Sequence, residues 1–226
     1  MNLLAIETAT QACGAGVRTS GDVEVTRVLD LERRHTEVLV SGIATLLAET
    51  GLVARDIDRV VVDIGPGLFT GLRVGIATAI GLAEGLGCGL VGVTSLELLA
   101  HGAHDAGVRG MVVGVVDGRR GEVFVQTFAL GDDVQARGGP SVATPRDVVI
   151  EWATNGASVT FTGDGVDRYN ADFNAVSNGQ ILAQSVPSLH AALRLGASRR
   201  PQESVAPLYL READAVANFT TRERPV

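Results

Sequence analysis

The stretch from Asp63 to Gly75, DIGPGLFTGLRVG, holds the residue types best suited to chemistry. An apolar run ends at Asp63, a Gly-Pro-Gly turn follows, and a threonine stands where a helix would begin. Glycines permit close backbone approach, and the N–H groups of a strand–loop–helix corner can bind an anion. We therefore predict a nucleotide or anion corner, whose residues would be Glu7, Gly65, Gly67 and Thr70. A tight turn with close helix packing explains the same glycines. The phosphate-binding pattern GxxxxGK[ST] is absent from a chain that contains no lysine.

The helix expected over 69–86 carries small residues in two rows. One row is Gly71, Gly75 and Ala79, and the other is Ala77, Gly81 and Gly85. An interior glycine costs about 1 kcal/mol relative to alanine, so several in one helix indicate a compensating close contact. Two small faces favour two contacts, one with the sheet beneath the helix and one with a partner outside it.

The elements that position these residues form a recognisable order. Short apolar runs at 3–7, 13–18, 22–29, 59–64 and 90–93 predict strands, and helical spacing marks 36–50, 69–86 and 94–104. This β-β-β-α-β-α-β-α order is typical of a ribonuclease-H-like mixed sheet. A second hairpin at 111–129 opens like the first, with Asp117 in the place of Glu7. We predict two related lobes, 1–105 and a smaller, degenerate 106–226.

Composition narrows the function classes. The 226 residues are 46% hydrophobic and carry a net charge of −7, which argues against a free-standing nucleic-acid binder. No uninterrupted apolar run of about 18 residues occurs, so we expect no membrane-spanning helix. The N-terminus does not read as a secretory signal, and the two cysteines form no CxxC pair. A reduced, cytoplasmic location is expected.

Six segments together resemble the TsaB (YeaZ) family of bacterial accessory proteins for tRNA threonylcarbamoyladenosine synthesis. They are AIETATQACGAGV, RRHTEVLV, DIGPGLFTGLRVGIATAIGLA, VGVTSLELLA, VVDGRRGEVFVQTF and PLYLRE. Leu68 departs from the serine usual in that family. The resemblance implies an actin-like (ASKHA) fold with a reduced second lobe. It also implies pairing with a TsaD-like catalytic paralogue, a TsaE-like ATPase in the assembly, a homodimer when the chain is alone, and tRNA contact only through the complex.

Comparison with the catalytic paralogue separates catalyst from accessory subunit. The paralogue binds its metal through a His-x-Glu-x-His motif, and the matching positions here are Ser95 and Leu99. Neither side chain replaces an imidazole. We expect no catalytic residue, no metal and no cofactor on this chain, with ATP and metal on the partner subunits. The alternative is an ATP-binding kinase or ATPase of the same superfold, built around Glu7, Asp117 and the glycine turns.

The resemblance also places the partner contact on two helices, 36–50 and 69–86. We predict that Gly75→Leu or Ala79→Arg blocks pairing and leaves the monomer folded. The residues predicted to bind the partner are Thr36, Leu39, Val40, Ile43, Leu47, Gly71, Arg73, Gly75, Ala79 and Leu82.

Overall fold

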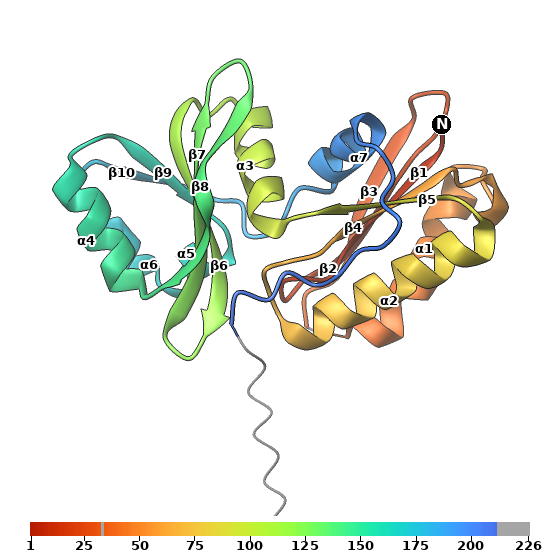
Figure 1. Cartoon of the computed structure of the whole chain (residues 1–226), viewed down its shortest axis with the longest axis horizontal. Helices are drawn as coiled ribbons and strands as arrows, with labels where there is room; N and C mark the ends of the chain where they lie inside the picture. Colours follow the sequence, from red (N-terminus) through yellow and green to blue (C-terminus); the bar gives the residue numbers. More distant parts are fainter. Residues whose placement is uncertain (33, 212–226) are drawn as a thin grey trace, which may run out of the picture.

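The chain folds into two lobes that lie side by side, each built on one five-stranded mixed sheet (Figure 1). The computed structural model describes residues 1–32 and 34–211. The α/β, two-lobe, actin-like architecture expected from the sequence is confirmed. Glu212, the last residue of the PLYLRE segment, and the end of the predicted second lobe lie outside the described residues.

The first sheet has the strand order β3-β2-β1-β4-β5, with β1 at its centre. The first three strands pair antiparallel, and β4 and β5 continue from β1 in parallel. Strands β1 and β4 are apolar along nearly their whole length because both faces of the sheet are covered. The strands are β1 (Leu3–Glu7), β2 (Cys13–Arg18), β3 (Glu24–Asp30), β4 (Arg59–Asp63) and β5 (Gly89–Val93).

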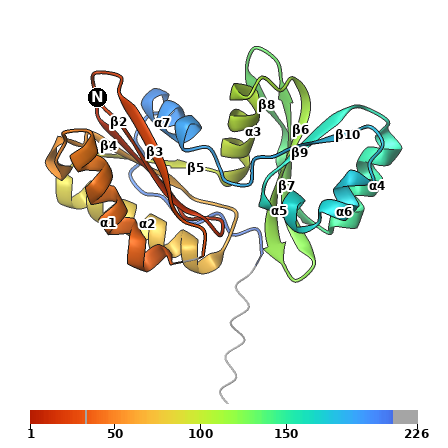
Figure 2. The same ribbon diagram turned by 180° about the vertical axis from the view of Figure 1, so that it is seen from behind.

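Helices cover both faces of this sheet. On one face, α1 (His35–Glu49) and α2 (Phe69–Leu86) lie next to each other and bury one continuous apolar core (Figure 1). On the other face, α7 (Leu189–Ser198) packs against β1, β2 and β4, as the reverse view also shows (Figure 2). A short 3-10 turn, η1 (Ala54–Asp56), precedes β4.

The second sheet repeats the topology of the first. Its order, β8-β7-β6-β9-β10, places its first strand at the centre, with two antiparallel neighbours on one side and two parallel strands on the other. The internal repeat expected from the two hairpins is thus present in the strand order. Its elements are β6 (Gly110–Arg119), β7 (Glu122–Leu130), β8 (Val134–Ala143), α4 (Pro145–Asn155), β9 (Val159–Thr162), α5 (Asp164–Arg168), α6 (Asn170–Asn174) and β10 (Gly179–Leu182).

The two lobes share elements at their junction. Helix α3 (Ser95–Asp105) follows the last strand of the first sheet, yet most of its buried leucines and alanines pack into the core beneath β6 and β7. Helix α7 comes after the second sheet in sequence but returns to the first lobe. Glu97 on α3 pairs with Arg199, just after α7, and Arg194 on α7 pairs with Asp105 on α3. Residues beyond 105 therefore complete the first lobe.

Helix α2 bears on the expectation that the chain has no helix able to span a membrane. With 18 residues and a mean hydropathy of 1.2, it is long and apolar enough to cross a membrane by length and composition. The core helix of a soluble protein passes the same test, and one face of α2 packs on β4 and β1. Only 33% of its residues are buried inside the chain, so much of this apolar helix lies at the surface.

Candidate functional site

The inner row of small residues on α2 packs against the chain itself. A Cβ added at Gly71 would lie 2.0 Å from the carbonyl oxygen of Thr8, and one at Gly75 would lie 2.1 Å from the Thr8 hydroxyl oxygen. That hydroxyl donates a hydrogen bond of 2.9 Å to the Gly71 carbonyl, and Ala79 is fully buried. These glycines permit the close approach of α2 to the end of β1. The expectation that Gly75→Leu or Ala79→Arg leaves the monomer folded is therefore wrong.

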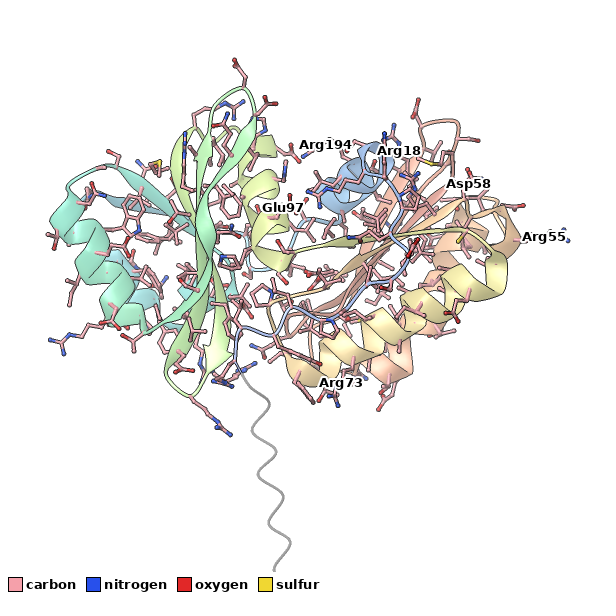
Figure 3. The ribbon with its side chains drawn as sticks, viewed as in Figure 1. Arg18, Arg55, Asp58, Arg73, Glu97 and Arg194 are labelled. Carbon is pink, nitrogen blue, oxygen red and sulfur yellow. The ribbon has the colours of Figure 1, made fainter. Side chains whose placement is uncertain are left out.

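The outer row of α2 lies at the surface, where its first residues contact Tyr209 and the rest are open. Every fourth residue from the start of the helix is exposed. A Cβ added at Gly81 or Gly85 would have no atom from elsewhere in the structure within 4 Å. The row carries one charge, on Arg73, whose side chain points outward from the first turns of the helix (Figure 3). The residues of this outer row are Phe69, Arg73, Ala77, Gly81 and Gly85.

Helix α1 adds a second exposed strip beside this row. Val40 is 67% exposed although it is a large apolar residue, and Thr36, Ala44 and Ala48 are exposed along the same helix. The structure thus leaves Thr36, Val40 and Arg73 at the surface and Leu82 half-buried. The other residues predicted to bind a partner lie in the core of the chain itself: Leu39, Ile43, Leu47, Gly71, Gly75 and Ala79.

An aromatic cluster at the start of α2 was not predicted. The rings of Phe69 and Tyr209 stack with centroids 5.3 Å apart. The guanidinium of Arg73 lies 3.7 Å from the centre of the Phe69 ring, and its Nε donates a hydrogen bond of 3.2 Å to the Tyr209 hydroxyl. Both rings are more than one-third exposed. The PLYLRE segment was the available signal, but nothing in its sequence indicates which helix it contacts.

The predicted anion corner contains a pair of buried carboxyl groups. Glu7 at the end of β1 and Asp63 at the end of the adjacent parallel strand β4 are both fully buried, and their carboxyl groups interact electrostatically. Burial, and next the negative charge of Asp63, raise the pKa of Glu7 well above its ordinary value. Asp63 accepts hydrogen bonds from the Gly65 N–H (2.7 Å) and the Ser95 hydroxyl (2.8 Å). Burial raises the pKa of Asp63 as well, so this corner disfavours two ionised carboxylates side by side.

The chain's own groups fill the rest of this corner. A Cβ at Gly67 would lie 2.1 Å from the Ala9 carbonyl oxygen, which already accepts a hydrogen bond of 2.6 Å from the Leu68 N–H. The Gly65 carbonyl accepts a hydrogen bond from the Ser95 N–H. Thr70 is exposed in the first turn of α2, whose N-cap is Leu68, so it does not cap the helix as expected.

The two positions that the family resemblance matched to metal ligands, Ser95 and Leu99, have structural roles here. Ser95 is fully buried, and its hydroxyl donates a hydrogen bond to the Asp63 carboxylate. Leu99 packs in the core beneath the second sheet. The Thr94 hydroxyl caps α3 by accepting a hydrogen bond from the Glu97 N–H, while the Glu97 carboxylate pairs with Arg199. Within the described residues no group of three His, Cys, Asp or Glu side chains is placed to hold a metal ion.

Asp117, which corresponds to Glu7 in the second lobe, is also engaged by other groups of the chain. The Asp117 carboxylate lies 2.9 Å from the Arg119 guanidinium and 3.5 Å from that of Arg168. Asp164 accepts a hydrogen bond from the Asp117 N–H, and burial raises the pKa of Asp164 to about 6. A cleft of about 400 Å³ opens between the lobes beside these residues. It is lined by Thr10, Gln11, Ala12, Leu31, Asp164, Asp167, Arg168, Ser185 and Val186.

Comparison with protein families matches this chain over most of its length. A family model described as "TsaD: tRNA N6-adenosine threonylcarbamoyltransferase" matches residues 30–217. The Escherichia coli protein named "tRNA threonylcarbamoyladenosine biosynthesis protein TsaB" is 32% identical over 165 residues, which are 69% of this chain and 71% of that protein. An uncharacterized protein of Mycobacterium leprae is 34% identical over 94% of this chain, but the match spans only 55% of that longer relative.

Solved structures show the same kinship in the fold. The structure of YeaZ from Pseudomonas aeruginosa superposes with a TM-score of 0.78 at 26% identity, and the match covers 92% of this chain and 99% of that one. A second Pseudomonas aeruginosa structure, described as similar to peptidase YEAZ, gives the same TM-score and identity. Both lobes are included in these matches.

Proposed function

This chain belongs to the TsaB (YeaZ) family, and from that premise we propose that it is a non-catalytic subunit of tRNA threonylcarbamoyladenosine biosynthesis. Its role would be to bind and support a TsaD-like catalytic paralogue. That paralogue would modify the adenosine next to the anticodon of ANN-reading tRNAs. A TsaE-like ATPase would join the assembly, tRNA would be reached only through the complex, and the location would be cytoplasmic.

The exposed outer row of α2 is the observation that carries this proposal. A row of small residues beside the exposed strip of α1 lets the backbone of a second helix pair approach closely, because Ala77, Gly81 and Gly85 project almost no side chain. Each glycine in the row costs helix stability, and a contact made in a complex offsets that cost. The same surface suits a homodimer when the partner is absent.

The chemistry of the buried acids favours a non-catalytic subunit over the alternative of an ATP-binding enzyme. A nucleotide site of this superfold needs a carboxylate free to hold Mg²⁺ or water. Here burial beside Asp63 raises the pKa of Glu7 and favours its neutral form, and Asp117 is paired with two arginines. We therefore assign no cofactor to this chain, and ATP and metal would reside on the partner subunits.

The proposal is tested by charging the outer row. Ala77→Arg adds a long cation to an exposed site, so the free chain stays folded, while a close helix contact is blocked. The matched control is Ala153→Arg, which adds the same side chain to an exposed position of α4 in the other lobe. We expect light scattering to give a 1:1 complex of the TsaD-like paralogue with the parent chain and the control, and separate subunits with Ala77→Arg.

Two results would contradict the proposal. One is a complex of unchanged mass and affinity with Ala77→Arg, which would remove the outer row from the contact. The other is no association between the parent chain and the paralogue. In that case saturable binding of Mg²⁺-ATP by the isolated chain would favour the enzyme alternative.

A further inference from the structure

The segment that follows α7 runs back along the first lobe. The Gln202 N–H donates to the Leu90 carbonyl at 2.8 Å, and its side-chain oxygen accepts from the Gly92 N–H at 2.7 Å, so it lies along the free edge of β5. Val205 packs into the core shared by α1 and α2. The Leu208 N–H then donates a hydrogen bond of 2.7 Å to the Ile64 carbonyl, just beyond β4. Residues 201–208 are thus fastened to the first lobe at several points.

The next residues belong to the second lobe. Leu210 packs into the apolar core beneath β6 and β7, and Arg211 pairs at 2.7 Å with Glu122 at the start of β7. An extended chain covers at most about 3.6 Å per residue, so anchors at Leu208 and Leu210 hold the two lobes within about 7 Å at this point. Figure 1 shows the segment leaving the first lobe and passing between the lobes, close to the start of α2.

Tyr209 lies between these two anchors. Its ring stacks on Phe69 and its hydroxyl accepts from Arg73, both in the first turns of α2. Phe69 and Arg73 also begin the exposed outer row of that helix. One residue of the segment therefore touches the candidate docking surface, while the next two hold the second lobe.

We propose that residues 207–211 are a strap that fixes the angle between the lobes and couples the docking surface of α2 to the second lobe. The claim that the strap fixes the angle between the lobes rests on contacts within the free chain. The coupling rests on the proposed function, since it requires a partner on α2. A partner that moves Arg73 or Phe69 would shift Tyr209, and with it the anchors of Leu210 and Arg211.

The strap is tested by measuring the distance between the lobes. Spin labels at Arg55→Cys, near β4, and Glu151→Cys, on α4, report one point in each lobe, in a chain carrying Cys88→Ser. Because Cys13 is buried, the two introduced cysteines are the thiols accessible to the spin label. We expect one narrow distance distribution in the parent chain. The triple variant Tyr209→Ala, Leu210→Ala, Arg211→Ala should lose that single peak and shift to longer distances, with circular dichroism unchanged.

A second ion pair provides the comparison. Arg194→Ala removes the Arg194–Asp105 contact between α7 and α3, at another part of the lobe junction. If the strap variant keeps the narrow distribution, or if Arg194→Ala alone broadens it, the junction of α3 and α7 sets the angle and the strap proposal is overturned.

The coupling is tested by adding the TsaD-like paralogue to the labelled chains. We expect the distance to shift in the parent chain, and the strap variant, if it still forms the complex, to show no matching shift. Complex formation without any shift in the parent chain would overturn the coupling and leave the docking proposal intact. Failure of the parent chain to form a complex would instead refute the docking proposal, and the coupling with it, while the free-chain distances still decide the strap.

Discussion

Two glycines on opposite faces of α2 should respond in opposite directions to the same substitution. Gly75→Ala places a Cβ 2.1 Å from the Thr8 hydroxyl oxygen, which is buried and hydrogen bonded to the Gly71 carbonyl. Gly81→Ala places a Cβ where no atom lies within 4 Å. Both substitutions gain the same helix propensity, so their difference isolates the contact between α2 and β1.

The magnitudes follow from three contributions. Replacing a helical glycine with alanine stabilises by about 1 kcal/mol at either site. At Gly75, displacing Thr8 leaves buried polar groups without a partner, which costs about 1–3 kcal/mol, and overpacking adds about 1–3 kcal/mol. We expect Gly81→Ala to raise the free energy of unfolding by about 1 kcal/mol and Gly75→Ala to lower it by about 1–5 kcal/mol.

Urea unfolding followed by far-ultraviolet circular dichroism measures this difference. The single tryptophan, Trp152, lies in α4 of the second lobe, so its fluorescence reports the other lobe and serves as an internal control. A Gly75→Ala chain as stable as the Gly81→Ala chain would refute the close contact between α2 and the end of β1. It would also reopen the inner row as a surface for a partner.

Further predictions concern the buried acids. The pKa of Asp164 rises from 3.8 to about 6 on folding, so its stabilising effect is full below pH 3.8 and lost as the pH rises through 6. Asp164→Asn, which keeps the acceptor for the Asp117 N–H, should gain up to about 3 kcal/mol over the parent at pH 8 but not at pH 3.5, measured by Trp152 fluorescence in urea. Equal differences at the two pH values would contradict this. Glu7→Gln should melt within a few degrees of the parent at pH 7, because burial beside Asp63 favours the neutral form of Glu7 and a neutral amide resembles that form, whereas Glu7→Ala should melt much lower. Ser95→Ala should cost about 1–3 kcal/mol in thermal unfolding, since Asp63 loses a buried donor; an unchanged transition would mean that this hydrogen bond does not form.

The sequence predicted the first lobe well because its signals are periodic and local. The predicted bounds of α2, 69–86, match the structure, and the four strands β1, β2, β4 and β5 begin or end within one residue of their expected positions. Buried parallel strands such as β4 are continuous β-branched runs, which few other elements resemble. The repeat of the hairpin was visible for the same reason.

The second lobe was predicted less completely. The polar, glycine-rich stretch at 131–140 did not predict a strand, but residues 134–143 form the edge strand β8. Gly138, Gly139 and Pro140 argue against a central strand, yet an edge strand tolerates them because one side of its backbone needs no pairing partner in the sheet. The short elements α5, α6 and β10 also went unpredicted, since four or five residues carry too little periodicity to be recognised.

The roles of the two small-residue rows could not be assigned from spacing. Both rows have the same period, and only the position of Thr8, more than sixty residues earlier, determines that Gly71 and Gly75 face inward. The same long-range packing buries Leu39, Ile43 and Leu47, which helical spacing alone could not distinguish from a partner-facing stripe. The outer row is the part of the prediction that remains available for a partner.

The duplicated topology makes the fate of the two equivalent acids informative. Glu7 and Asp117 each lie near the end of the central strand of a five-stranded sheet, where the carboxyl edges of the parallel strands meet. A two-lobed nucleotide enzyme would keep such groups charged and free to reach the cleft. In the first lobe burial beside Asp63 raises the pKa of Glu7, and in the second lobe Arg119 and Arg168 form ion pairs with Asp117. Under the proposed function, these two arrangements would leave neither acid available for nucleotide chemistry. The exposed face of α2, by contrast, keeps helix-weakening glycines that the isolated chain does not use. This combination favours a subunit whose function lies in the surface it presents rather than in its cleft.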